Sequence, residues 1–376
     1  MLLTLLVWNY TLSVAFVGLV TACAFDKTVI PLLQKHKALH IPLIVLGLSC
    51  SFVAELPLHV LLFKIIHVKF VHLFGGFDTF FPWLVYTLDL ATMAGLVGLF
   101  IQAENSRQDA DRVVRELDGK PIESFLSFPY LKHLVNPFYR IPLTVYPNIT
   151  YATNEECTEA IVKANDYSQP RFMTLDVYRS SHCPDGPLRP VLYGSKNTFH
   201  PFEALLVAEN NWVVVNIDYR LAPANAYPTH LLDVKRALRW VKQSIRSFGG
   251  DPNFVVLEGD SGGAQLAAMA AFTANQPEFQ PGFEEVDTSV QGVISLSGGL
   301  DIQTSEEAKA FFAERVIMDP NVKQSFLDEH SPIHVLPKAG RDGKLVPFLA
   351  IAGRLDSLND CSIAEDFKTI YDEGMQ

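Results

Sequence analysis

The chain has 376 residues, of which 49% are hydrophobic and 19% charged, so it falls outside the disordered class, which combines low hydrophobicity with high charge. Its formal net charge of −11 argues against a nucleic-acid partner, because binding a phosphate backbone requires a basic surface. The five cysteines are scattered and form no CxxC pair, so no metal site, redox motif or disulfide framework is predicted. Pairing of Cys157 with Cys183 would require an oxidising lumen, and we favour two free thiols.

Three apolar runs in the first hundred residues are predicted to be transmembrane helices: Leu2–Phe25, Ile41–Phe63 and Phe80–Ile101. Each reaches the length of about 20 helical residues that crosses a bilayer. The first run carries no charge and ends in Ala22-Cys23-Ala24, a pattern of small residues typical of signal-peptidase sites, so a cleaved signal peptide stays open as an alternative. The second run contains Pro57 and is the weakest of the three.

Two carboxylates lie inside these apolar runs, Glu55 in the second and Asp89 in the third. Such groups are costly in a bilayer, at about 2.5–3.5 kcal/mol on insertion scales. Either the two face each other or a polar cavity, or each is tolerated by water that enters the bilayer. We favour the second interpretation.

Basic residues indicate the orientation of the chain. They follow the first and third runs (Lys27, Lys35, Lys37, Arg107, Arg112, Arg115, Lys120), with only Lys64 and Lys69 between the second and third. With three spans, the positive-inside rule places everything after Ile101 in the cytoplasm, and we expect the endoplasmic reticulum or another endomembrane. The glycosylation sequon Asn148-Ile149-Thr150 matters only in a lumen, and the side is reversed if the first run is cleaved or the second does not span.

The composition predicts a membrane region over 1–103, a connector over 104–148 and an α/β domain over 149–376. The connector is rich in proline and aromatic residues, which lie either at the membrane interface or on the following domain. In the last region short apolar strands alternate with helices, which is typical of a parallel sheet with helices on both faces. The expected strands are Phe172–Tyr178, Trp212–Ile217, Phe254–Glu258, Val290–Ser295 and Val346–Ala352; the expected helices are Leu231–Phe248, one from Gln265 to Thr273, and Ser362–Tyr371.

The most informative motif is Gly259-Asp260-Ser261-Gly262-Gly263, which has the pattern G-x-S-x-G between a predicted strand and a predicted helix. In that context it predicts a nucleophile elbow, a tight turn that exposes the serine hydroxyl above the sheet. We expect Gly259 and Gly263 to keep side chains out of the turn. The Gly262 amide and the helix N-terminus would stabilise an oxyanion. The alternative is a glycine-rich turn with an incidental serine.

Several motifs precede this elbow in a fixed order: Asp218-Tyr219-Arg220-Leu221-Ala222-Pro223, Tyr227-Pro228, Asp233, Trp240 and Phe248-Gly249-Gly250-Asp251-Pro252. The order resembles the hormone-sensitive-lipase-like branch of the α/β-hydrolase esterases, and also carboxylesterases with an N-terminal membrane segment. The resemblance extends over roughly Asp176 to Asp356. It implies an α/β-hydrolase fold with an eight-strand core and hydrolysis of carboxylic esters by a Ser-Asp-His triad, with no cofactor.

Asp356 is the candidate acid of that triad. It follows the predicted strand Val346–Ala352 in Gly353-Arg354-Leu355-Asp356, which matches the family's Gly-x-x-Asp position. Such an acid accepts a hydrogen bond from the base and fixes its tautomer. The alternative is a helix cap for the segment that starts at Asn359.

Two parts of the family's machinery are missing from this pattern. The base is expected beyond Asp356, but no histidine follows His334; His200 and His230 would need an unfamiliar position, and His230 begins a helix. The family's His-Gly-Gly loop is also absent, because Pro190-Val191-Leu192 leads directly into Tyr193-Gly194-Ser195-Lys196. We therefore expect the third strand and its glycine-rich turn to be skipped or shortened, which would leave the sheet unstable unless Val191-Leu192-Tyr193 forms a short substitute strand.

Two classes of function remain open at this stage. The first is a membrane-anchored serine esterase or lipase acting on apolar carboxylic esters, with this chain a C-terminally truncated form of it. The second is a catalytically inactive binding or regulatory protein that keeps the fold. A third hypothesis gives the function to the membrane spans.

Overall fold

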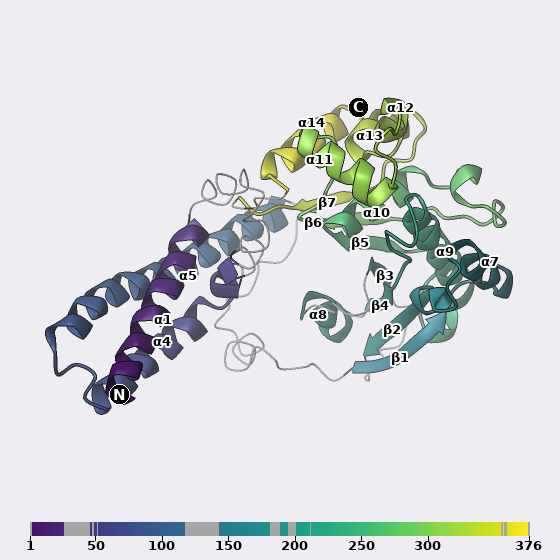
Figure 1. The fold of residues 1–376 in the computed structure, drawn as a ribbon. Helices are drawn as coiled ribbons and strands as arrows, with labels where there is room; N and C mark the ends of the chain where they lie inside the picture. Colours follow the sequence, from purple (N-terminus) through teal and green to yellow (C-terminus); the bar gives the residue numbers. More distant parts are fainter. Residues whose placement is uncertain are drawn as a thin grey trace. The chain divides into compact units, whose positions relative to one another are not determined.

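The computed structural model describes residues 2–25, 46, 49–50, 52–116, 143–180, 189–194, 201–210, 212–354, 356 and 359–374. The chain forms two compact units, Met1–Phe138 and Tyr139–Gln376, and each is described here by itself (Figure 1).

The first unit is built from α1 (Leu2–Phe25), α4 (Pro57–Leu73) and α5 (Phe80–Glu116), which lie side by side in Figure 1. Helices α1 and α5 run in the same direction. Tyr10 contacts Asp89 near the beginning of both helices, and Phe25 approaches Gly98 further along both. Helix α4 runs the opposite way, since Lys64 pairs with Asp89 while Val71 packs with Val85, earlier in α5.

Two of the predicted spans are confirmed as helices, and the second differs. α1 has the predicted bounds, and α5 continues past the predicted end to Glu116. The run Ile41–Phe63 does not form one helix, because the backbone bends at Leu56 and α4 begins at Pro57. Proline favours a first helical turn because it lacks the N–H that would need a partner. Within the described ranges, α1 and α5 are the helices long and apolar enough to cross a membrane.

The interpretation of the two carboxylates as separately solvated is wrong for Asp89. Its side chain is fully buried and forms an ion pair with Lys64, with 2.8 Å between Nζ and Oδ1. Glu55, by contrast, lies on the exposed side of its helical segment. The two carboxylates therefore do not share a polar cavity.

The second unit contains a sheet of seven strands in the part that the structure describes, in the order β1-β2-β4-β3-β5-β6-β7. The strands are β1 (Leu143–Thr150), β2 (Thr174–Ser180), β3 (Arg189–Gly194), β4 (Trp212–Ile217), β5 (Val256–Asp260), β6 (Gly292–Leu296) and β7 (Phe348–Ile351). β1 and β2 are antiparallel to their neighbours, and the pairs from β4 to β7 are parallel. All the carboxyl ends of the parallel strands therefore meet at one edge, where a site is expected.

The expected loss of the third strand is wrong. β3 lies at the centre of the sheet and pairs in parallel with β4 along its whole length, from Arg189 opposite Trp212 to Gly194 opposite Ile217. Its other edge pairs with β5. The sheet is thus continuous, and the instability expected from a gap does not follow.

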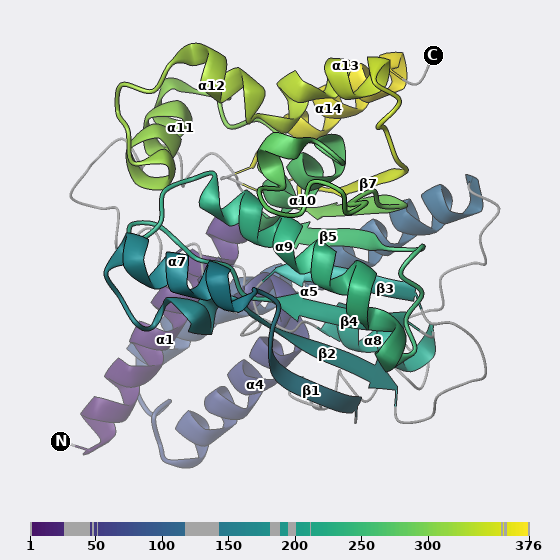
Figure 2. The same ribbon diagram turned by 90° about the vertical axis from the view of Figure 1, so that its right-hand side faces the viewer.

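Helices cover both faces of the sheet, as predicted. On one face lie α7 (Asn154–Ala164), α9 (Thr229–Ser244), α10 (Gly262–Phe272), α13 (Pro332–Arg341) and α14 (Cys361–Gly374), which share the main hydrophobic core. α9 crosses in front of the strands in Figure 2. α8 (Pro201–Glu209) packs on the opposite face, where Val207 contacts Val214 and Val256. The short helices α11 (Glu306–Phe311) and α12 (Gln324–Glu329) follow β6.

Candidate active site

Ser261 occupies the turn between β5 and α10, with φ 53° and ψ −116°. A positive φ is strained for any residue other than glycine and costs roughly 1–3 kcal/mol. The side chain is exposed at the carboxyl edge of the sheet. The elbow expected from the sequence is therefore present in the backbone.

The glycine nearest to this turn is needed for close approach. A Cβ on Gly259 would stand 2.2 Å from the carbonyl oxygen of Gly263 and 2.6 Å from the amide nitrogen of Ala264. A Cβ on Gly263 would meet nothing within 4 Å. The expectation that both glycines keep side chains out of the turn thus holds for Gly259 and is wrong for Gly263.

The loop after β6 holds the elbow in place. The Ser261 amide donates to the Leu296 carbonyl at 2.9 Å, and the Gly299 amide donates to the Ser261 carbonyl at 3.2 Å. Ser297 in this loop also has a positive φ of 43°. These supporting residues were not predicted from the sequence, although the pair Gly298-Gly299 directly after a predicted strand was a signal for them.

Gly262 is the first residue of α10 and is exposed beside Ser261. The first amides of a helix have no intrahelical acceptor, and the helix dipole makes that end attractive to negative charge. The Gly262 amide is therefore free of the helix ladder in the position where an oxyanion donor is expected. Asp260 ends β5 and is exposed at the same edge.

Asp356 lies in the loop after β7, half-buried. Its Oδ1 accepts a hydrogen bond from the Asn359 amide at 3.0 Å, two residues before α14 begins at Cys361. The carboxylate that accepts from the first turn of α14 is that of Asp360, which binds the Ser362 amide at 3.0 Å. The Asn359 side chain in turn donates from Nδ2 to the Ser297 carbonyl at 2.8 Å. Asn359 thus ties the loop of the candidate acid to the loop that holds Ser261.

The described histidines are engaged away from Ser261. His230 is buried in the first turn of α9 between the rings of Tyr219 and Tyr227, and burial lowers the pKa of its imidazole. His330 stacks on Phe326 at 4.0 Å between ring centroids, with Nδ1 2.7 Å from the Phe326 carbonyl oxygen. His200 lies outside the described residues. Among the described residues of the second unit, no histidine makes a hydrogen bond to Ser261.

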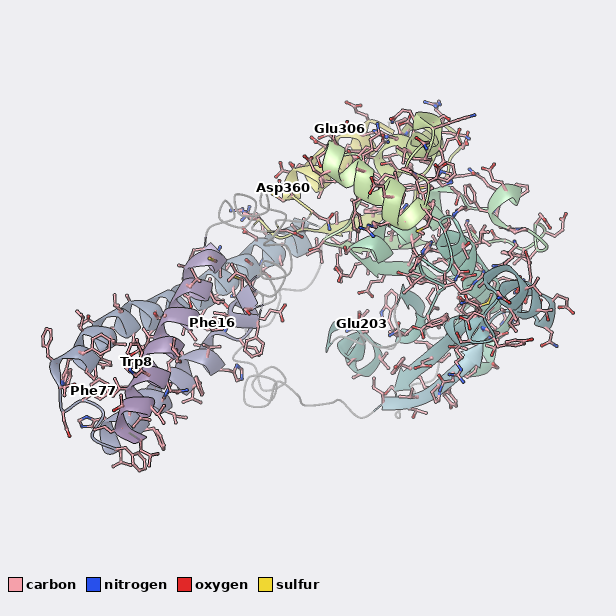
Figure 3. All side chains as sticks on the ribbon, in the orientation of Figure 1. Trp8, Phe16, Phe77, Glu203, Glu306 and Asp360 are labelled. Atoms are coloured by element: carbon pink, nitrogen blue, oxygen red, sulfur yellow. The ribbon has the colours of Figure 1, made fainter. Side chains whose placement is uncertain are left out.

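A buried carboxyl group lies in the strand that leads to the elbow. Glu258 in β5 is 2% exposed, and burial, followed by the charge of Glu203 on α8, raises its pKa to about 8. Figure 3 labels Glu203 on α8. No role was predicted for Glu258 from the sequence, although an acidic residue at the end of an apolar strand was a visible signal. The described residues contain no cluster of three or more aspartate, glutamate, histidine or cysteine side chains that could bind a metal ion.

Arg220, in the loop after β4, forms a buried ion pair with Asp233 on α9. Both Nε and Nη2 of Arg220 donate to the Asp233 carboxylate, at 2.8 and 2.7 Å. Lys235 on the same helix is also buried and donates from Nζ to the carbonyls of Ala270 and Thr273, each at 2.8 Å. These bonds fix the C-terminal end of α10 to α9. They thereby position α10, whose N-terminus follows Ser261.

Residues 191–365 match a family described as having the α/β hydrolase fold. The chain is also similar to three proteins of Mycobacterium tuberculosis (strain ATCC 25618 / H37Rv). It is 35% identical to the probable carboxylic ester hydrolase LipM over 50% of this chain and 49% of that protein, and 38% identical to the esterase LipQ over 38% and 37%. It is 34% identical to the esterase LipC over 54% and 52%. The chain thus spans about half or less of the length of these relatives.

Proposed function

On the premise that this chain is a member of the α/β-hydrolase superfamily, we propose that it hydrolyses carboxylic esters with Ser261 as the nucleophile. The observation that carries the proposal is the strained backbone of Ser261, at φ 53° in an exposed turn between β5 and α10. A protein that only kept the fold would gain nothing from holding a serine in that conformation.

The chemistry follows from the groups around this turn. Ser261 Oγ attacks the ester carbonyl and gives its proton to a base, and the carbonyl oxygen becomes an oxyanion that the Gly262 amide stabilises. The tetrahedral intermediate expels the alcohol, which takes the proton back from the base. Water then hydrolyses the acyl-enzyme by the same steps. Asp356 is the acid that would orient a histidine base.

A fluorophosphonate probe with a reporter tag tests the nucleophile directly. We expect it to modify Ser261 in the full chain and to leave Ser261→Ala unmodified. Ser297→Ala is the matched control, because Ser297 lies in the neighbouring loop and also has a positive φ. Labelling that persists in Ser261→Ala would assign the reactive group elsewhere.

A second candidate function is that of a non-catalytic member of the fold that binds a ligand or a partner. It is favoured by the packing of His230 and His330 in aromatic surroundings and by the absence of the family's glycine pair in Tyr193-Gly194-Ser195-Lys196. A chain that binds esters without releasing alcohol, in the presence or absence of added imidazole, would support this candidate.

We further propose that the first unit anchors the protein in a membrane by crossing it three times. α1 and α5 both have the length and hydropathy of a span, and they run in the same direction. Two parallel spans require the chain between them to return across the bilayer. α4 is the antiparallel helix placed for that return.

The outward faces of these helices support the membrane placement. Trp8 and Phe16 on α1 are about half exposed (Figure 3), at 56% and 55%. α4 likewise exposes a row of large apolar side chains: Leu62, Phe63, Ile65, Ile66, Phe70 and Leu73. Such a surface is suited to lipid rather than to water. Retention in the membrane pellet after carbonate extraction is expected, and recovery in the soluble fraction would contradict this part of the proposal.

The basic residues then give the side of the membrane. With three crossings, the segment after α1 faces the same compartment as the last turns of α5 and the residues that follow them. Both stretches are rich in lysine and arginine: Lys27, Lys35 and Lys37 follow α1, Arg107, Arg112 and Arg115 lie in the last turns of α5, and Lys120 follows α5. The positive-inside rule makes that compartment the cytoplasm. The proposed substrate is an apolar ester that reaches the hydrolase from an endomembrane.

A further inference from the structure

The interior of the first unit contains an ion pair that joins α4 to α5. Lys64 Nζ lies 2.8 Å from Asp89 Oδ1, and both side chains have no exposed surface. The Tyr10 hydroxyl of α1 donates to the other oxygen, Oδ2, at 3.0 Å. One carboxylate therefore receives a group from each of the other two helices.

Close packing between α1 and α5 sets the register of Tyr10 and Asp89. A Cβ on Gly18 would stand 3.0 Å from the Thr92 hydroxyl, and a Cβ on Gly95 would stand 2.8 Å from the Thr21 methyl group. Small residues of this kind let two helices approach closely in a membrane. The Tyr10 ring also lies beneath the Lys64 ammonium, 5.6 Å from its centroid.

α4 differs from α1 and α5 because its length and hydropathy alone do not predict a transmembrane helix. It is 17 residues long and contains Lys64 and Lys69, so only α1 and α5 pass the test of length and hydropathy within the described ranges. Its exposed face is nevertheless mainly apolar, with Lys69 and His72 confined to its last turns, whereas Lys64 is buried. An unpaired ammonium would oppose insertion, and a partner within reach removes that opposition.

We propose that Lys64 and Asp89, completed by the Tyr10 hydroxyl, form a charge lock that allows α4 to cross the membrane as a hairpin with α5. This inference rests on the three-crossing placement proposed above. The lock neutralises the charge that each helix would otherwise carry into the bilayer alone. It thereby determines on which side the second unit is placed, since α4 supplies the second of the three crossings.

The chain offers a native reporter of that outcome. Asn148-Ile149-Thr150 is a glycosylation sequon in β1, and Asn148 is exposed at a bulge with φ 57°. With three crossings the sequon faces the cytoplasm and stays unmodified. If α4 fails to cross, the second unit faces the lumen and Asn148 becomes a substrate for glycosylation.

The experiment translates the full chain in the presence of endoplasmic reticulum membranes. A second, opposite reporter is a flexible polar loop with one sequon, inserted between Gly75 and Gly76 in the turn from α4 to α5. The wild-type chain is expected to carry a glycan on the inserted loop and none on Asn148. Asn148→Gln identifies which site is modified.

Lys64→Asp and Asp89→Lys each place two like charges in the interior. We expect each to reduce glycosylation of the inserted loop at least fivefold and to cause modification of Asn148. The double variant Lys64→Asp with Asp89→Lys restores a pair of opposite charges and is expected to return the wild-type pattern. Lys69→Asp is the matched control, because Lys69 is exposed on the same helix and undergoes the same change of charge.

The possible results separate the lock from the placement on which it rests. A wild-type pattern in both single variants would overturn the lock and leave the three crossings intact. Failure of the double variant to restore the pattern that both single variants lost would overturn the pairing. A glycan on Asn148 of the wild-type chain would overturn the three-crossing placement and the lock together, whereas the reaction with a fluorophosphonate probe tests the proposed hydrolase separately.

Discussion

The carbonyl oxygen of Gly263 lies 2.2 Å from the position that a Cβ on Gly259 would occupy. These two residues are the first and the last of the G-x-S-x-G motif, and their backbones touch because β5 turns directly into α10. The contact explains why the serine between them is exposed, since no side chain fits inside the turn.

The first prediction uses the asymmetry of these two glycines. Gly259→Ala forces its methyl group onto backbone atoms and should lower the free energy of unfolding by about 3 kcal/mol. Gly263→Ala is the matched control, because its methyl group meets no neighbour and alanine is favoured over glycine in a helix by about 1 kcal/mol. Chemical unfolding of the full chain in detergent, followed by tryptophan fluorescence, compares the two. Equal free energies of unfolding for Gly259→Ala and Gly263→Ala would show that the turn has room for a methyl group at Gly259.

The second prediction concerns pH. The pKa of Glu258 is raised from 4.5 to about 8, so the folded protein keeps this proton over a range in which the unfolded chain has lost it. Folding stability should therefore fall as pH rises from about 4.5 to 8, by up to roughly 5 kcal/mol at about 1.4 kcal/mol per pH unit.

Glu258→Gln should flatten this dependence, because glutamine has no proton to lose. Glu278→Gln replaces an exposed carboxylate in the same unit and should leave the slope unchanged. The test compares the denaturant midpoints of unfolding of the wild-type chain and both variants from pH 5 to pH 8. A wild-type slope in Glu258→Gln would assign the pH dependence to other groups.

The third prediction concerns the buried pair of Arg220 and Asp233. Arg220→Ala leaves a carboxylate in the interior with only Arg236 as a charged neighbour, and we expect a loss of about 3 kcal/mol. Lys163→Ala removes an ion pair with Glu159 that is largely exposed, and it should cost no more than about 0.5 kcal/mol. Similar losses in both variants would show that burial of the pair does not matter.

The fourth prediction tests how the acid loop is held. Asn359→Asp keeps the size of the side chain and removes the Nδ2 donor to the Ser297 carbonyl. Amide hydrogen exchange at residues 297–299 should become about fivefold faster, as expected from the loss of a hydrogen bond worth roughly 1 kcal/mol. Unchanged exchange at these amides would mean that the two loops are held by other contacts.

The sequence predicted those elements whose hydrophobic pattern matches their burial in the folded protein. Trp212–Ile217 is a continuous apolar run and forms β4 with the expected bounds. Ser261 was predicted at a strand-to-helix turn because its glycine-rich motif lies between an apolar strand pattern and a run of small helix-forming residues. The alternation of strands and helices likewise predicted the layers of the second unit.

The misses have physical causes. β3 was expected to be skipped because Pro190-Val191-Leu192 leads directly into Tyr193-Gly194-Ser195-Lys196 without the family's glycine-rich loop, yet the neighbouring strands β4 and β5 supply partners on both edges. The partner of Asp89 was missed because Lys64 is 25 positions away on a helix that bends at Pro57, and its inward direction depends on the packing of all three helices. Neither feature is visible in a local pattern.

The central claim is that Ser261 is the nucleophile of an ester hydrolase. It is tested most directly by the rate at which a fluorophosphonate modifies Ser261 in the full chain, measured by mass spectrometry with and without added imidazole. His230 and His330 are packed among aromatic rings, and we therefore predict slow modification that imidazole accelerates at least tenfold, and none in Ser261→Ala. Complete absence of modification at Ser261 in both conditions would contradict the claim and would favour the non-catalytic candidate.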